Sequence, residues 1–356
     1  MKTNMIGMKL KQLETPVATV DVDQLQENIG GLQIYLDKHN IANRPHIKTH
    51  KIPDIAHMQI DAGAVGITCQ TLREAEVMAQ AGIKDIFLPY NFIGEQKLDR
   101  LMHLTRIATV SVTADSHVVV QGLIGAAKKE GIVLTVLVEF DTGGQRCGVQ
   151  SPSEAVELVA CIADSDSLHF GGLMTYPCND NTDSFVGETK DLLEPEGLLI
   201  ERVSVGGTPV MWNAASHPEI TEYRAGMYIY GDRYLIEAGA MQLEDCAFRV
   251  ITTVVSRPTA DRGILDAGSK TLAADIKGLV GHGLIVEYPL ANIYQLSEEH
   301  GHVDFSNCKK KPRIGERLTL IPNHCCVVNN LFNKIIGLRH GEVDIIWQVK
   351  ARGELH

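Results

Sequence analysis

Between residues 15 and 235, short apolar or β-branched segments alternate with longer segments of helical period. The pairs "VGITC" and "TLREAEVMAQAG", "DIFLPY" and "GEQKLDRLMHLT", and "ATVSVTA" and "HVVVQGLIGAAKKEG" show this alternation. Strands separated by helices form parallel sheets, and about eight such units suit a closed (β/α)8 barrel better than an open, doubly wound sheet. We expect the first strand in "TPVATVDV" and the barrel domain over residues 13–240.

The pattern of the sequence changes after residue 240. Segments such as "FRVITTVVSR", "ERLTLIPNH" and "KIIGLRHGEVDIIWQV" alternate as strands do and carry few helical periods. We therefore expect a second, all-β domain over residues 241–356. A chain of 356 residues is long enough for two domains with sizeable cores.

Charge and composition narrow the classes of function. The formal net charge is −11 and the sequence pI is near 5.7, which argues against nucleic-acid binding because such surfaces cluster Lys and Arg. No apolar run approaches the roughly 18 to 20 residues of a membrane helix, and "MKTNMIGMKL" does not resemble a secretory signal. We expect a cytoplasmic protein with a small-molecule substrate, and we interpret its eight cysteines as thiols or metal ligands.

The segment "RPHIKTHK" concentrates basic side chains at one point of an acidic chain. Read as a strand, it places Arg44, His46, Lys48 and His50 on one face and apolar residues on the other. A solvated sheet edge would explain the pattern. However, Lys48 falls at the C-terminal end of a barrel strand, where active sites gather, and neighbouring positive charge disfavours its ammonium form. Such a lysine suits Schiff-base chemistry.

Four motifs occur in order: "RPHIKTHK", "DTGGQRCGV", "GGTP" with "RAGMYIYGD", and "PNHCC". Together they resemble the fold-type III pyridoxal phosphate enzymes, and within these the D-threonine aldolase and D-serine dehydratase family with its alanine racemase-like N-terminal barrel. The resemblance runs from about residue 13 to residue 353. It implies a barrel that binds pyridoxal 5'-phosphate, a β domain, a head-to-tail homodimer, and Lys48 as the lysine that carries the cofactor.

The "GGTP" motif is a candidate phosphate cradle. Gly206 and Gly207 let the backbone approach an anion closely, and Thr208 adds a hydroxyl donor, although a plain turn would have the same letters. The resemblance implies that the backbone amides of Gly226, Met227 and Tyr228 complete the cradle. Tyr228 as a simple core aromatic residue is the alternative.

Two further residues are implied in cofactor binding. Arg146 carries a permanent charge that can hydrogen-bond a phenolate oxygen, and the resemblance directs it to the 3'-oxygen of the cofactor. The resemblance also places Tyr176, at the end of a predicted strand, beside the pyridine ring. A surface arginine in a loop and a packed core tyrosine are the respective alternatives.

The motif "PNHCCVV" lies in the predicted β domain. If it is extended, His324 and Cys326 point the same way and Cys325 points the opposite way. Imidazole with thiolate favours zinc, or another first-row ion such as manganese, over magnesium or calcium. A His-x-Cys pair by itself is usually a chance occurrence and does not indicate a metal site. The resemblance implies that the pair binds a metal ion, whose open coordination positions would accept a substrate hydroxyl.

These parts predict a lyase that acts on D-3-hydroxy amino acids. Dehydration of D-serine or D-3-hydroxyaspartate would give a 2-oxo acid and ammonia, and aldol cleavage of D-threonine would give glycine and an aldehyde. In the family, His-x-Cys ligation accompanies the zinc dehydratases, so dehydration is preferred. The segment "PCNDNTDSF" after Tyr176 lacks the histidine expected of an aldolase, although dehydratases often carry one too. An amino-acid racemase and a non-catalytic pyridoxal phosphate carrier are the further alternatives.

Overall fold

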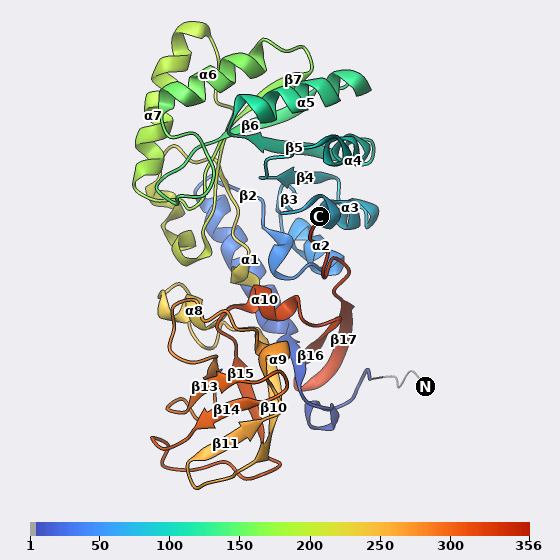
Figure 1. Cartoon of the computed structure of the whole chain (residues 1–356), viewed down its shortest axis with the longest axis vertical. Coiled ribbons are helices and arrows are strands. Elements are labelled where there is room, and N and C mark those ends of the chain that lie inside the picture. Colours follow the sequence, from blue (N-terminus) through green and yellow to red (C-terminus); the bar gives the residue numbers. More distant parts are fainter. Residues whose placement is uncertain (1–4) are drawn as a thin grey trace. The chain divides into compact units, whose positions relative to one another are not determined.

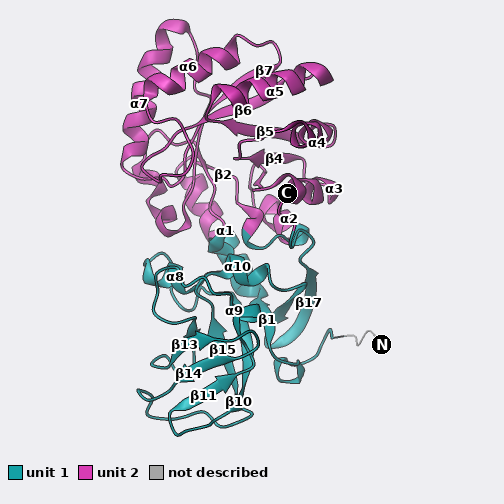
Figure 2. Cartoon of the chain, viewed as in Figure 1, with its two compact units in different colours: residues 1–30, 49–54, 227–353 teal, residues 31–48, 55–226, 354–356 magenta. Residues whose placement is uncertain are grey.

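The structure of the chain is a computed structural model that describes residues 5–356. It divides into two compact units, which are coloured separately in Figure 2. The barrel unit comprises residues 31–48, 55–226 and 354–356. The sheet unit comprises the described residues up to 30, together with 49–54 and 227–353.

Parallel strands form the centre of the barrel unit. They are β2 (Ala42–Asn43), β3 (Ile67–Thr68), β4 (Asp85–Leu88), β5 (Thr109–Ala114), β6 (Leu134–Glu139), β7 (Leu168–Met174), β8 (Arg202–Val205) and β9 (Glu222–Tyr223). Their spatial order is β2-β9-β8-β7-β6-β5-β4-β3. The two ends of this row meet in a parallel bridge between His46 and Thr68, with 2.8 Å from Thr68 N to Pro45 O. The eight-stranded sheet is therefore closed, which confirms the predicted (β/α)8 barrel.

Helices follow the barrel strands and cover the outside of the sheet (Figure 1). They are α2 (Pro53–Asp61), α3 (Leu72–Gln80), α4 (Glu95–Thr105), α5 (His117–Glu130), α6 (Pro152–Ala163) and α7 (Asn181–Leu193), and α1 (Val22–Lys38) precedes the first barrel strand. The sequence defines several starts: Thr71 and Glu74 form a capping box at α3, and Ser151 caps α6. Within residues 5–356, no helix has the length and hydropathy to cross a membrane.

Short 3-10 helices lie where the chain turns. They are η1 (Leu10–Gln12), η2 (Ile47–Thr49), η3 (Glu194–Glu196), η4 (Thr208–Ser216) and η5 (Met227–Ile229).

The inside of the barrel is filled by side chains, as in the fully buried cluster of Phe87, Leu137 and Met174 from three strands. Because side chains fill this interior, a ligand has to bind at the rim of the barrel.

The sheet unit holds a nine-stranded sheet. Its strands are β1 (Val17–Asp21), β10 (Phe248–Ser256), β11 (Arg262–Leu265), β12 (Leu284–Ile285), β13 (Asn292–Leu296), β14 (Gly301–Asp304), β15 (Arg317–Ile321), β16 (Lys334–Arg339) and β17 (Glu342–Gln348). The order is β13-β14-β11-β10-β1-β16-β17, and β15 pairs with β10 and β12. Three short helices accompany it: α8 (Arg233–Glu237), α9 (Ser269–Leu272) and α10 (Cys325–Asn329).

The strand expected to open the barrel belongs to the other sheet, so that expectation was wrong. "TPVATVDV" contains β1, which pairs antiparallel with β10 and parallel with β16. The eight barrel strands instead run from β2 to β9. The pattern of β1 shows only that it is buried, and does not show which strands it pairs with. The compact units accordingly differ from the predicted ranges 13–240 and 241–356: residues 13–30, 49–54 and 227–240 belong to the sheet unit, and residues 354–356 belong to the barrel unit.

Candidate active site

Lys48 lies at the rim of the barrel, directly after the bridge that closes it. His46 forms that bridge, and η2 begins at the next residue. The expectation of a strand through "RPHIKTHK" therefore holds only as far as His46, and the alternation argument fails beyond it. The reason is that sheet pairing ends at the closing bridge, so the backbone is free to turn. Lys48 is still at the C-terminal end of a barrel strand, where active sites of this fold form.

Tyr176 brings the predicted cofactor residues together. It follows β7 and is 41% exposed, so it is a rim residue rather than a packed core tyrosine. The Lys48 Nζ atom lies 5.8 Å from the centroid of its ring, and the Arg146 Cζ atom lies 5.1 Å from the same centroid. A lysine and an arginine thus flank one partly exposed aromatic ring, as a site for an anionic aromatic ligand requires.

His46 does not add positive charge to this site. Its side chain is 7% exposed, its Nε2 lies 3.1 Å from Gln70 Oε1, and its Nδ1 accepts from Lys48 N at 3.4 Å. Burial, together with the nearby ammonium of Lys48, lowers the pKa of His46 well below its ordinary value. The imidazole is therefore neutral. Positive charge around Lys48 comes from Arg146 and Arg224 instead. Both guanidinium groups also lower the pKa of His46.

The start of the loop that presents Arg146 is held by the carboxylate of Asp141. Asp141 accepts hydrogen bonds from the backbone N–H groups of Gly143, Gly144 and Gln145 at 3.0, 2.7 and 3.1 Å. Arg146 Nη2 then lies 3.5 Å from Oε1 of the buried Glu139. Burial raises the pKa of Glu139, and Arg146 opposes that shift. Arg146 is exposed at the surface, and its side chain is positioned by Glu139 and by the ring of Tyr176.

The predicted phosphate cradle follows β8. Gly207 has a φ of +134°, which favours glycine, and Thr208 begins η4. The Thr208 hydroxyl accepts from Gly226 N at 3.2 Å, so its own proton remains available for an anion. A Cβ atom at Gly206 would lie 3.5 Å from Tyr176 Cδ2, which places the cradle next to the tyrosine ring.

Met227 and Tyr228 follow Gly226 directly in the chain and begin η5, but they belong to the sheet unit. Tyr228 is 1% exposed. Their proposed backbone contacts with phosphate stay a prediction.

Replacing Gly207 with alanine should weaken cofactor binding about tenfold to a hundredfold. A side chain at the positive φ of Gly207 adds about 1–3 kcal/mol of backbone strain, and the free energy of cofactor binding would have to offset this strain to keep the cradle in its shape. Activity should recover at saturating cofactor, because an anchoring group does not take part in bond breaking. Titration of the metal-replete, cofactor-free protein with pyridoxal phosphate measures the effect.

The matched control is Gly131→Ala. Gly131 also has a positive φ, +67°, and ends α5 with no neighbouring atom within 4 Å of an added Cβ. It should lower stability without changing cofactor affinity. Equal cofactor affinity in the wild type and the Gly207 variant would place the phosphate elsewhere.

Sequence reasoning missed Arg224. This side chain is 6% exposed and donates to Ser204 Oγ at 2.6 Å and to Thr175 O at 3.0 Å. Burial lowers the pKa of Arg224 to about 10, so it stays charged at neutral pH. The available signal was its place two residues before Gly226 in "RAGMYIYGD", next to a predicted cradle residue.

The candidate metal ligands lie in the sheet unit. His324 is the N-cap of α10, and Cys325 and Cys326 form its first turn. The expected extended conformation of "PNHCC" was therefore wrong from Cys325 onward. The side chains of His324 and Cys326 nevertheless hydrogen-bond to each other at the start of the helix.

Burial and neighbours distinguish the two adjacent thiols. Cys325 is fully buried, and burial raises its pKa well above the ordinary value. A hydrogen bond from Cys325, with support from His324, lowers the pKa of Cys326 well below the ordinary value. Thr49 Oγ1 also lies 3.2 Å from Cys326 Sγ. Cys326 is therefore the thiolate of the pair, and a thiolate is the form that binds metal.

The donor set fits a divalent ion with open coordination positions. One imidazole and one thiolate favour zinc or a similar first-row ion. In the part of the chain that the structure describes, no group of three or more His, Cys, Asp and Glu residues could hold a metal ion. With His324 and Cys326 as its protein ligands, a metal could accept oxygen ligands from solvent or substrate.

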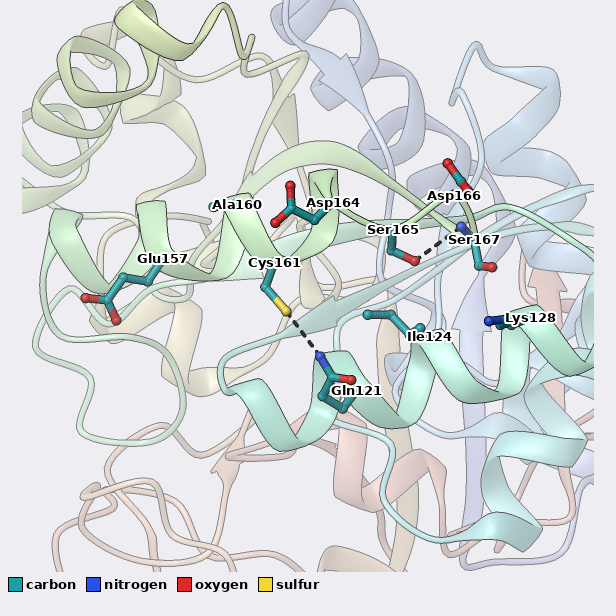
Figure 3. Close-up of a pocket in the computed structure, with 10 residues that line it drawn as sticks. All are labelled: Gln121, Ile124, Lys128, Glu157, Ala160, Cys161, Asp164, Ser165, Asp166 and Ser167. Carbon is teal, nitrogen blue, oxygen red and sulfur yellow. Dashed lines mark hydrogen bonds between the residues drawn. The ribbon is translucent and has the colours of Figure 1, made fainter.

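A polar groove on the barrel unit is separate from these residues. It lies between α5 and α6 and is lined by residues such as Gln121, Lys128, Glu157 and Cys161 (Figure 3). Gln121 Nε2 donates to Cys161 Sγ at 3.4 Å across it. These helices cover the outside of the barrel, so the groove does not contribute to the rim site.

Comparison with known families decides the relationship of the chain. Residues 20–234 match the alanine racemase N-terminal domain. The chain belongs to this family. Residues 247–338 match a second family, described as a putative serine dehydratase domain. The combination confirms the predicted resemblance to enzymes that have both domains.

Relatives of both predicted reaction types match nearly the whole chain. D-threonine aldolase from Arthrobacter sp is 32% identical over 365 residues, covering 98% of this chain and 95% of that protein. D-threo-3-hydroxyaspartate dehydratase from Delftia sp. (strain HT23) is 29% identical, covering 91% of this chain and 93% of that protein. The family relationship therefore includes aldolases and dehydratases.

Solved structures agree with the fold. D-threonine aldolase from Filomicrobium marinum superimposes with a TM-score of 0.90 at 30% identity and covers 99% of both chains. A cysteine-to-alanine variant of D-threo-3-hydroxyaspartate dehydratase, in the metal-free form, has a TM-score of 0.85 at 26% identity, covering 96% of this chain and 98% of that one. A histidine-to-alanine variant of the same enzyme is also solved, and one residue separates its site from that of the cysteine.

Proposed function

We propose that this protein is a lyase that acts on D-3-hydroxy amino acids and depends on pyridoxal 5'-phosphate and a divalent metal ion, most simply zinc. The pairing of His324 with the thiolate of Cys326 carries the proposal. It is supported by relatives of nearly full length that are named for aldol cleavage and for dehydration of such amino acids.

The rim residues of the barrel unit would hold the cofactor. Lys48 would bind it covalently, Arg146 would donate to its phenolate oxygen, and Tyr176 would pack against its ring. Gly206, Gly207 and Thr208 would hold its phosphate with backbone N–H groups and a hydroxyl. When bound, pyridoxal phosphate supplies the electron sink that weakens the bonds at the α-carbon of an amino acid.

His324 and Cys326 would hold the metal in the sheet unit. A divalent ion with open positions supplies Lewis acidity toward the β-oxygen of a bound substrate. Thr49, which contacts Cys326 at 3.2 Å, is the residue that follows Lys48 in the chain. Thr49 and both proposed ligands belong to the sheet unit, so this contact is made within that unit.

Dehydration is the reaction that we favour. The second proposed ligand of this chain is a cysteine two positions after a histidine. D-threo-3-hydroxyaspartate dehydratase also has a cysteine two positions after a histidine, and its variant without that cysteine is solved in the metal-free form. Aldol cleavage is the second candidate, favoured by the similarity to the D-threonine aldolases. A non-catalytic carrier is disfavoured because it would have no use for a metal pair.

A product analysis tests the proposal. The protein, saturated with pyridoxal phosphate and zinc, is incubated with D-serine, D-threonine and D-3-hydroxyaspartate, and with their L-isomers as controls. We expect a 2-oxo acid and ammonia from the D-isomers. Glycine with an aldehyde would show the aldolase, and racemisation without any carbonyl product would overturn the lyase proposal.

The family resemblance also leads us to propose a homodimer. Light scattering on the purified protein should give twice the mass of one 39.0 kDa chain. A stable, active monomer would contradict that proposal.

A further inference from the structure

Asp275 makes a short contact with the candidate ligand His324. Asp275 lies between α9 and β12, and its Oδ2 is 2.6 Å from His324 Nδ1. Its other oxygen, Oδ1, accepts from Lys277 N at 3.1 Å. Both carboxylate oxygens are therefore used, one on the imidazole and one on the backbone of its own loop.

The segment around this contact is fixed from a second direction. Asn323, the residue before His324, is 2% exposed and donates to Gly281 O at 2.7 Å. Arg233 donates to Val280 O at 2.6 Å and lies 3.4 Å from Asn323 Oδ1. The loop that carries Asp275 and the turn that carries His324 thus share several hydrogen bonds.

The contact determines which nitrogen of His324 is available. An ionised carboxylate only accepts hydrogen bonds, so the proton on the imidazole sits at Nδ1. The lone pair is then at Nε2, and the hydrogen bond restrains rotation of the ring. A carboxylate behind a metal-binding imidazole also raises its basicity as a ligand.

We propose that Asp275 is a positioning residue that orients His324 for metal binding through its Nδ1 hydrogen bond. The inference rests on the proposed metal site and adds to it a residue 49 positions away in sequence. Asp275 does not touch the metal or the substrate in this proposal. It acts through His324 alone.

Zinc affinity of the full-length protein tests the proposal. The metal-stripped wild type and the variants Asp275→Ala and Asp275→Asn are titrated with zinc in competition with a chromophoric chelator. Loss of such a partner typically weakens metal binding about tenfold to a hundredfold, which we expect for Asp275→Ala. Asp275→Asn should lie between it and the wild type, because the amide oxygen still accepts from Nδ1 but carries no charge.

The chain offers a matched control in the barrel unit. Asp183 Oδ2 lies 2.7 Å from His217 Nδ1, and Asp183 Oδ1 accepts from Glu219 N at 3.2 Å. This pair has the same chemistry as Asp275 and His324 but contains no proposed metal ligand. Asp183→Ala should therefore bind zinc as tightly as the wild type.

The outcomes separate the inference from the proposed function. Wild-type zinc affinity in Asp275→Ala would overturn the positioning role, while zinc binding by the wild type would still support the metal site. No zinc binding by the wild type would overturn the metal site itself. Thermal unfolding of the metal-free forms is measured alongside, and if Asp275→Ala does not fold, the affinity of Asp275→Asn decides.

Discussion

Replacing Lys48 with alanine should abolish lyase turnover, with a loss of at least about a thousandfold, because the variant loses the amine that we propose links the cofactor covalently. The expectation depends on its position at the barrel rim, 5.8 Å from the centre of the Tyr176 ring. Turnover of D-serine or D-threonine by the purified variant measures the loss.

Chemical trapping gives an independent measurement of the same assignment. Borohydride reduction of the wild type with bound cofactor should attach the cofactor to the peptide that contains Lys48. Lys270 is the matched control, because it is exposed and pairs only at the surface with Glu299 at 2.6 Å. Lys270→Ala should keep full activity. Trapping on Lys51 or Lys270 would show that Lys48 is not the cofactor lysine.

Removing the metal should reduce turnover by about a thousandfold or more while leaving the cofactor bound. Lewis-acid stabilisation of a developing charge is worth several kcal/mol, and each 1.36 kcal/mol corresponds to about a factor of ten. Cys326→Ala should reproduce the effect of chelation, because Cys326 is the low-pKa thiol that contacts His324. Bound zinc, the cofactor absorbance and turnover are measured on the same samples.

The neighbouring cysteine is the control for this prediction. Cys325 is fully buried with a raised pKa, so Cys325→Ala should keep the metal and lose only about 1 kcal/mol of stability from a small cavity. Full turnover by the chelated enzyme would contradict a catalytic metal. Loss of metal in Cys325→Ala with retention in Cys326→Ala would reverse the assignment of the ligand.

Sequence reasoning located most of the rim residues because each one follows a strand. Lys48, Arg146, Tyr176 and the Gly206 turn all come after apolar segments of the β/α alternation. In a closed parallel barrel the C-terminal ends of the strands meet at one rim, so residues that are distant in sequence converge there. The flanking of Tyr176 by Lys48 and Arg146 agrees with this reasoning.

The local backbone conformation was less predictable from the sequence than which side chains lie close together. His324 and Cys326 were expected to meet through strand alternation, and they meet through the N-cap of α10 instead. The two side chains therefore meet although the expected conformation was wrong, and their role as metal ligands stays a prediction. Similarly, "RPHIKTHK" leaves the strand at His46, yet Lys48 remains at the rim.

The sequence by itself determined the alternation of strands and helices and the residues placed at strand ends, because these depend on local periodicity and chain order. Only the tertiary structure decided that β1 joins β10 and β16. It alone also revealed that Asp275 contacts His324 across 49 residues. Strand partners and carboxylate contacts depend on which distant segments pack together, and an apolar pattern or a single aspartate carries no record of its partner.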